Sequence, residues 1–165
     1  MRIRPFRHSD AGIIKSFVTS EREHYLWSAN RIPYDFDEET FCHILDNEEM
    51  DDVSSFTALE DGKPVGFFCI KLEQNQNAGY MKYIIVDGSK RGMGYGSQMV
   101  KLAMKYAFTI LQFDSLKLSV FEQNIPAMKA YEKAGFREIE YVKDAFTYQE
   151  EKWGRYILQA KAQQE

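Results

Sequence analysis

Few cysteines occur in the sequence, and they form no metal-binding pattern. Cys42 and Cys69 stand far apart, and no Cys-x-x-Cys pair is present. The histidines His8, His24 and His43 show no ligand spacing with these cysteines, so the sequence predicts no metal site. We expect both thiols to be free, buried and reduced rather than joined in a disulfide.

Long hydrophobic runs and an excess of positive charge are also missing. No apolar run approaches the roughly 18 residues that a membrane-spanning helix needs. The start, Met-Arg-Ile-Arg-Pro, lacks the apolar segment of a secretory signal, so we expect a cytoplasmic protein without a membrane partner. The net charge of -4 and the pI of about 5.5 argue against a nucleic-acid partner.

Aromatic and aliphatic side chains, by contrast, are abundant. Hydrophobic residues make up 44% of the sequence, which includes 12 Phe and 10 Tyr. A chain of 165 residues with this composition can bury one substantial core. We therefore expect a single domain over residues 1–165.

Hydrophobic periodicity predicts a mixed order of strands and helices. Strands are expected over residues 1–6, 54–60, 64–73, 79–86, 115–121, 136–144 and 152–159. Helices are expected from Ser9 or Asp10 through Val18, and over residues 37–46, 94–112 and 124–133. For residues 21–33, which Pro33 interrupts, the sequence predicts neither a helix nor a strand. The strands on either side of the 94–112 helix should be parallel, because a helix crosses between them.

Acidic residues gather in one part of the chain. Between Arg31 and Lys63 there are eleven Asp or Glu and no Lys or Arg. A solvated face is the ordinary explanation for such a run. The alternative is a negative rim that attracts a cationic substrate.

A glycine-rich segment follows the strand that ends at Val86. It reads Arg-Gly-Met-Gly-Tyr-Gly-Ser over residues 91–97 and leads directly into a helical pattern. Free amides at a helix start favour an anion, and glycine lets a ligand approach the backbone. The glycine spacing matches neither the dinucleotide fingerprint nor the Walker loop, which disfavours NAD or a nucleotide. The segment predicts a pyrophosphate site, and a plain loop is the alternative.

Together with a second pattern downstream, this segment resembles the GNAT superfamily of N-acetyltransferases. The combined pattern is Arg91-x-x-Gly94-x-Gly96, then Asn124-x-x-Ala127-x-x-x-Tyr131, then Gly135-Phe136. The resemblance is tightest over residues 83–136 and is nearest to the branch that acetylates protein N-termini and polyamines. It implies an α/β fold with a mixed, mostly antiparallel central sheet of six to seven strands and helices on both faces. The sheet would splay at the parallel strand pair around residues 83–86 and 116–121.

The resemblance also implies acetyl-CoA as cosubstrate and gives individual residues roles toward it. The cofactor-binding residues it implies are Ile84, Ile85 and Val86 for the pantetheine arm, and Arg91, Gly92, Met93, Gly94, Tyr95, Gly96 and Ser97 for the pyrophosphate. Asn124 would cap a helix and contact the cofactor. Tyr131 would be catalytic, because a phenol with a reference pKa near 10 can protonate the leaving thiolate.

The implied reaction is direct attack of a neutral amine on the thioester in a ternary complex. The Val86 amide would stabilise the developing oxyanion. Some family members carry a carboxylate base at the position of Tyr80, where this chain has none. The substitutes we consider, each acting through water, are Glu21, Glu23, His24 and Glu73.

The acceptor pocket is expected between the segment after the first helix and the closing strand pair. Its candidate wall residues are Tyr25, Trp27, Tyr34, Phe36, Tyr141 and Tyr148, for which core packing is an equal alternative. The expected acceptor is a small cationic amine or a peptide N-terminus. Because the carboxylate is missing, a non-catalytic CoA-binding regulatory or interaction module remains an alternative, and a homodimer through the closing strands stays open.

Overall fold

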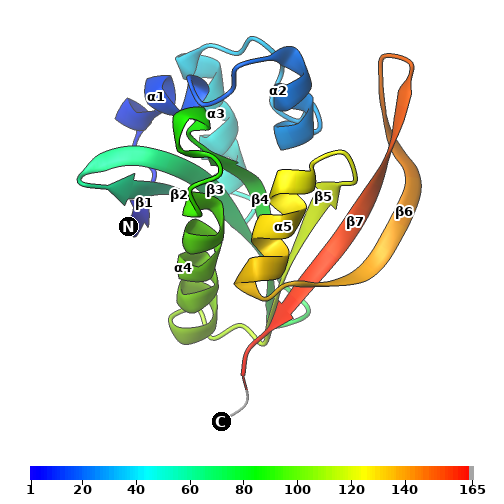
Figure 1. The fold of residues 1–165 in the computed structure, drawn as a ribbon. Helices are drawn as coiled ribbons and strands as arrows, with labels where there is room; N and C mark the ends of the chain where they lie inside the picture. The colour runs from blue at the N-terminus through cyan, green and yellow to red at the C-terminus, as the bar shows by residue number, and fades with distance from the viewer. Residues whose placement is uncertain (164–165) are drawn as a thin grey trace.

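A computed structural model describes residues 1–163, which form one seven-stranded sheet with helices on both faces (Figure 1). The strand order is β1-β2-β3-β4-β5-β7-β6. Within these residues, β4 and β5 pair in parallel and every other neighbouring pair is antiparallel. The predicted mixed, mostly antiparallel α/β sheet with its parallel pair is therefore confirmed.

The elements follow one another as the hydrophobic pattern predicts, with one helix added. The strands are β1 (Arg2–Pro5), β2 (Val53–Glu60), β3 (Lys63–Glu73), β4 (Ala78–Val86), β5 (Ser115–Phe121), β6 (Arg137–Tyr148) and β7 (Glu151–Lys161). The α-helices are α1 (Ala11–Lys15), α2 (Glu21–Ser28), α3 (Glu38–Glu49), α4 (Tyr95–Thr109) and α5 (Ile125–Ala134), and short 3-10 turns are η1 (His8–Asp10) and η2 (Gly88–Lys90).

Two cores lie on opposite faces of the sheet. On one face, α4 and α5 cover buried β5 residues such as Leu116 and Leu118. On the other face, α1 and α3 pack on Phe67 of β3 and Ile85 of β4. A smaller aromatic cluster around Trp153 of β7 lies under α2. The helices thus leave one part of the sheet, between β4 and β5, bordered by α2 and α5.

The helix α2 is the element that the sequence analysis missed. Ser20 accepts a hydrogen bond from the Glu23 amide at 3.2 Å and so caps the helix start. Ala29, in the left-handed region at φ 49°, ends the helix before Pro33 is reached. Because the chain must turn into this cap, α1 ends at Lys15 and does not continue to Val18 as predicted.

Both cysteines are free, as expected; Cys69 is buried, whereas Cys42 is only partly buried, so the expected burial is wrong for Cys42. Burial raises the pKa of the Cys69 thiol to about 12, which keeps it protonated and unreactive. None of the helices described over residues 1–163 is both long enough and apolar enough to span a membrane.

The close contact between β3 and α4 gives a test of the packing. A Cβ added to Gly66 would lie 2.5 Å from Met99 Sδ and 3.2 Å from the carbonyl oxygen of Ile85. We predict that Gly66→Ala lowers the free energy of unfolding by about 1–3 kcal/mol, measured by urea denaturation, because the buried Met99 must move. Gly96→Ala is the control, since its nearest neighbour, Ala130 Cβ, is 3.6 Å away. Equal destabilisation of both variants would contradict the packing explanation.

Candidate active site

The parallel strands β4 and β5 separate partway along their length. Residues 78–81 of β4 pair with residues 115–118 of β5, and pairing stops there. Residues 82–86 then diverge from residues 119–121, whose other edge stays paired with β7. The predicted splay is confirmed, and it begins after Met81 and Leu118.

A bulge in β4 lies where the split begins. Tyr83 adopts φ 51°, in the left-handed region, and the β3–β4 register shifts beside it, between the pairs made by Phe67 and Cys69. Glu48 of α3 holds the bulge in place: it accepts hydrogen bonds from Tyr83 Oη at 2.6 Å and from Lys82 Nζ at 2.7 Å. Burial and the contact with Glu48 raise the pKa of Tyr83 well above its ordinary value, so its hydroxyl stays a donor.

The glycine-rich segment forms an anion cradle at the start of α4. Gly92 and Gly94 have φ of 74° and 82°, and no atom lies within 4 Å of a Cβ added to either. Within residues 1–163, the main-chain amides of residues 92–97 donate no hydrogen bond. Unpaired amides at a helix N-terminus are suited to a phosphate group. This geometry fits the pyrophosphate site that the sequence predicts.

Arg91 uses its side chain inside the protein rather than toward the cradle. Its guanidinium pairs with Glu23 and donates to the carbonyl oxygen of Phe17 at 3.1 Å. The bonds tie the glycine-rich loop to the chain around the start of α2. The Arg91 amide also donates to the Gly88 carbonyl oxygen, at 3.4 Å, so the unpaired amides begin at Gly92 and the expected contact of Arg91 with the pyrophosphate is not supported.

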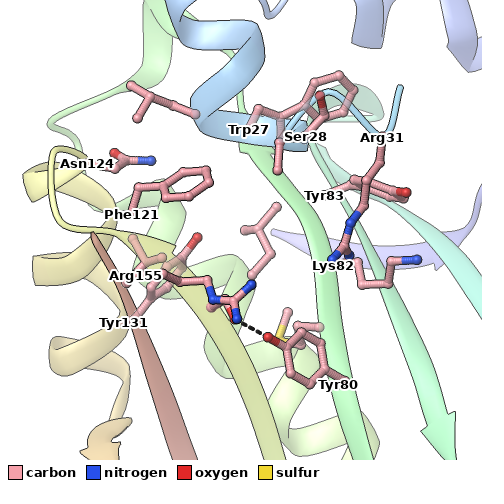
Figure 2. A pocket seen from close by; sticks show the side chains of 16 residues that line it. Trp27, Ser28, Arg31, Tyr80, Lys82, Tyr83, Phe121, Asn124, Tyr131 and Arg155 are labelled. Carbon is pink, nitrogen blue, oxygen red and sulfur yellow. Dashed lines mark hydrogen bonds between the residues drawn. The ribbon is translucent and has the colours of Figure 1, made fainter. Parts of the chain in front are cut away.

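A cleft of about 100 Å³ occupies the split, bordered by α2 on one side and α5 on the other (Figure 2). Its lining comes from segments far apart in the sequence, including Trp27, Ser28, Arg31, Tyr80, Lys82, Tyr83, Ile84, Ser119, Phe121, Asn124, Tyr131 and Arg155. Of the residues that the resemblance implies for the cofactor, Ile84 and Asn124 line this cleft, and Tyr131 joins them.

Tyr131 and Asn124 reach the cleft from α5. Tyr131 is only 6% exposed, and burial raises the pKa of its hydroxyl above the ordinary value, so it stays protonated. Asn124 occupies the N-cap position of α5, but its side chain makes no capping hydrogen bond, so the predicted capping role is wrong. Its ψ of 64° departs from the extended backbone that places a capping side chain over the helix amides. The side-chain amide of Asn124 is therefore available to a ligand in the cleft.

The predicted substitutes for a base do not line the cleft. His24 is buried, with Nε2 2.5 Å from the Ile32 carbonyl oxygen, and burial lowers its pKa. Burial raises the pKa of Glu23, but hydrogen bonds from Thr19 and Arg91 outweigh this effect, so the pKa lies below its ordinary value. Glu73 pairs with Lys117 and Glu21 is exposed.

The position at which some family members carry a base has a structural role here. Tyr80 bonds through its hydroxyl to the hydroxyl of Ser119, across the last paired part of β4 and β5. Among the described residues that line the cleft there is no carboxylate and no histidine.

One of the six candidate wall residues, Trp27, lines the cleft. The other five pack elsewhere: the tilted rings of Tyr25 and Tyr148 have centroids 4.9 Å apart, Tyr34 contacts His24, Phe36 is buried, and Tyr141 donates to Glu122 at 2.8 Å. Sequence reasoning missed Arg31 and Arg155. Arg31 follows the unpredicted helix α2, and no pattern in the sequence marks which residues of β7 face the split.

Comparison with known proteins decides the family to which this chain belongs. The pattern of the acetyltransferase (GNAT) family matches residues 15–136 of the chain. The chain belongs to the GNAT family. Tyr131, Asn124 and the glycine-rich cradle all fall inside the matched segment.

Curated GNAT relatives match over part of their length. The spermidine N(1)-acetyltransferase of Vibrio cholerae is 34% identical over 82 residues, 47% of this chain and 47% of that protein. The L-amino acid N-acetyltransferase AaaT of Escherichia coli K12 is 31% identical over 90 residues, 53% and 55% of the two chains. An N-acetyltransferase 9-like protein of Caenorhabditis briggsae is 31% identical over 71 residues, 42% of this chain and 36% of that protein. The matches thus span about a third to just over half of these relatives.

Solved structures share the fold over nearly the whole chain. The spermidine N-acetyltransferase of Vibrio cholerae, crystallised with CoA and spermine, superposes with a TM-score of 0.82 at 17% identity, covering 97% of this chain and 94% of that one. A putative phosphinothricin N-acetyltransferase gives a TM-score of 0.76 at 20% identity and covers 99% of both chains. At such identities the likeness shows the fold alone.

The cradle can be tested by removing one of its glycines. We predict that Gly94→Ala weakens CoA binding about tenfold, because a left-handed residue with a side chain costs about 1–2 kcal/mol and the Cβ enters the phosphate site. Isothermal titration with CoA measures the effect. Gly62→Ala is a matched control, because Gly62 has φ 77° and equally open surroundings in the β2–β3 turn. Equal loss of affinity in both variants would argue against the cradle.

Proposed function

We propose that residues 1–165 form one acetyltransferase domain that transfers an acetyl group from acetyl-CoA to a primary amine. The observation that carries the proposal is the split between β4 and β5, with the amide cradle at one end and Tyr131 inside. Family membership supports the same reaction. The acceptor would be a small amine or a peptide N-terminus, and a cytoplasmic location remains a prediction.

The cosubstrate would be held by main-chain groups of this chain. The amides of residues 92–97 would bind the pyrophosphate, since they donate no hydrogen bond within residues 1–163. Residues 84–86 of β4 have lost their β5 partner, so their free edge would pair with the pantetheine arm. Acetyl-CoA supplies the activated thioester, and the protein supplies orientation.

The remaining steps belong to Tyr131 and to the main chain of β4. Tyr131 would donate its hydroxyl proton to the sulfur as the thiolate leaves, and its raised pKa keeps that proton available. The Val86 amide would stabilise the charge that develops on the carbonyl oxygen. Since no carboxylate or histidine of residues 1–163 lines the cleft, the acceptor would lose its ammonium proton to solvent.

The direct test is release of CoA thiol from acetyl-CoA with a panel of primary amines and short peptides. Turnover of any amine supports the proposal. Tight CoA binding without turnover of any amine or peptide would favour the alternative, a non-catalytic CoA-binding module.

Replacing the proposed proton donor separates catalysis from binding. We predict that Tyr131→Phe lowers kcat about a hundredfold or more and leaves the CoA dissociation constant unchanged, because only the proton is removed. Steady-state thiol release and calorimetry give the two quantities. Tyr106→Phe is the control, since Tyr106 packs against Phe56 in the core away from the cleft. A Tyr131→Phe variant with normal kcat would overturn the assignment.

The pH profile tests the absence of a protein base. We predict that log kcat/KM rises with unit slope from about pH 6 up to the pKa of the acceptor amine, because only the neutral amine attacks. Tyr131 adds no falling limb in this range, since its donor form persists below its raised pKa. Two acceptors of different amine pKa should give correspondingly shifted midpoints. A midpoint that stays fixed for both would reveal a protein base.

A further inference from the structure

The cleft is lined by three cationic side chains and, among the described residues, by no carboxylate. Lys82 is neutralised by Glu48, its salt-bridge partner at 2.7 Å. Arg31 and Arg155 form no salt bridge with any residue of the described chain. Among the described residues, Arg155 and the exposed Arg31 therefore carry the cleft charges that no salt bridge neutralises.

Of these two arginines, Arg155 is the stronger candidate for binding a ligand. It lies on β7 opposite Phe121 of β5, and its side chain extends into the cleft toward Tyr80 (Figure 2). Its Nε atom is buried and has no hydrogen-bond partner among residues 1–163. A buried donor without an acceptor is costly, and a charged one more so. Such a group is explained when a ligand supplies the missing acceptor.

Arg155 lies on the sheet face away from the cofactor cradle. Side chains alternate along a strand, so Arg155 shares a face with Trp153, which packs in the cluster under α2. The cradle begins α4, which covers the opposite face with α5. An anion held by Arg155 would therefore belong to the acceptor rather than to the phosphates of CoA.

We propose that Arg155, assisted by Arg31, binds a carboxylate of the acceptor, so that the acceptor is an amino acid or another small amine that carries a carboxylate. This inference rests on the proposed acetyl transfer. A guanidinium pairs with a carboxylate through two parallel hydrogen bonds, which fixes the orientation of the acceptor.

The two guanidinium groups also help the chemistry. Nearby positive charge disfavours the ammonium form and lowers the pKa of the acceptor amine. More neutral amine is then present at a given pH, which offsets the lack of a base in the cleft. The same field repels a polyamine, whose charges are all positive.

The acidic residues between positions 31 and 63 do not reverse this field. Glu48 is used by Lys82 and Tyr83, Asp46 pairs with His8, and Asp37 caps α3. Asp51 and Asp52, with Glu73, line an adjoining surface hollow that shares Arg31, Tyr80 and Lys82 with the cleft, and Lys71 lies among them. None of the eleven lines the cleft itself.

Matched amines test the substrate class. Thiol release is measured with L-leucine and isopentylamine, L-phenylalanine and phenethylamine, L-lysine and cadaverine, and spermidine. We predict that the carboxylated member of at least one pair has a kcat/KM, expressed per neutral amine, that is higher by about tenfold or more, as expected for hydrogen bonds between charged groups. Equal or better turnover of the decarboxylated amines, or of spermidine, would overturn the inference and leave acetyl transfer standing. No turnover of any amine would remove both.

Substitution of Arg155 tests the residue. We predict that Arg155→Gln raises KM for the carboxylated acceptor about tenfold or more and abolishes the preference within the pair, while CoA affinity is unchanged. Arg31→Gln should act in the same direction with a smaller effect. Lys152→Gln is the control, because Lys152 is an exposed cation on the same strand. An Arg155→Gln variant that binds CoA normally and keeps the preference would overturn the assignment.

Discussion

The arrangement of this GNAT chain depends on the point at which β4 and β5 stop pairing. Main-chain groups beyond that point have no strand partner, and a buried main-chain group without a partner is costly. Two features keep the strands apart. The bulge at Tyr83, held by Glu48, bends β4, and β7 holds the far edge of β5 through Phe121. The split is therefore fixed by the protein and is ready for a ligand.

The split also brings together residues from opposite faces of the sheet. Tyr131 enters from α5, and Arg155 enters from β7 on the face covered by α2. Arg91 links the two sides, because its guanidinium joins the cofactor cradle to Glu23 at the start of α2. In the proposed reaction the cosubstrate and the acceptor approach from different sides and meet between the strands, so neither has to pass the other.

The fold was largely predictable from the sequence, and the cleft was not. Strands such as β5 and the long helix α4 have strong hydrophobic periodicity, and the glycines at 92 and 94 mark the cradle by their spacing. The sequence did not predict the helix α2, because its aromatic residues face several clusters and form no single apolar stripe. Arg31 and Arg155 escaped because a guanidinium in a cleft and one in solvent look alike in a sequence. Their roles depend on contacts between distant segments.

The short parallel pairing has a mechanical consequence. Within residues 1–163, strand pairing between the β1–β4 part and the β5–β7 part of the sheet is confined to residues 78–81 of β4 and 115–118 of β5, and the Tyr80–Ser119 hydrogen bond lies beside the last pair. In the proposed complex, a bound pantetheine would lie between β4 and β5 and connect them until it dissociates. Binding and release of the cosubstrate would then strengthen and weaken the connection between strands β1–β4 and strands β5–β7, and the stiffness of the molecule would vary through each turnover.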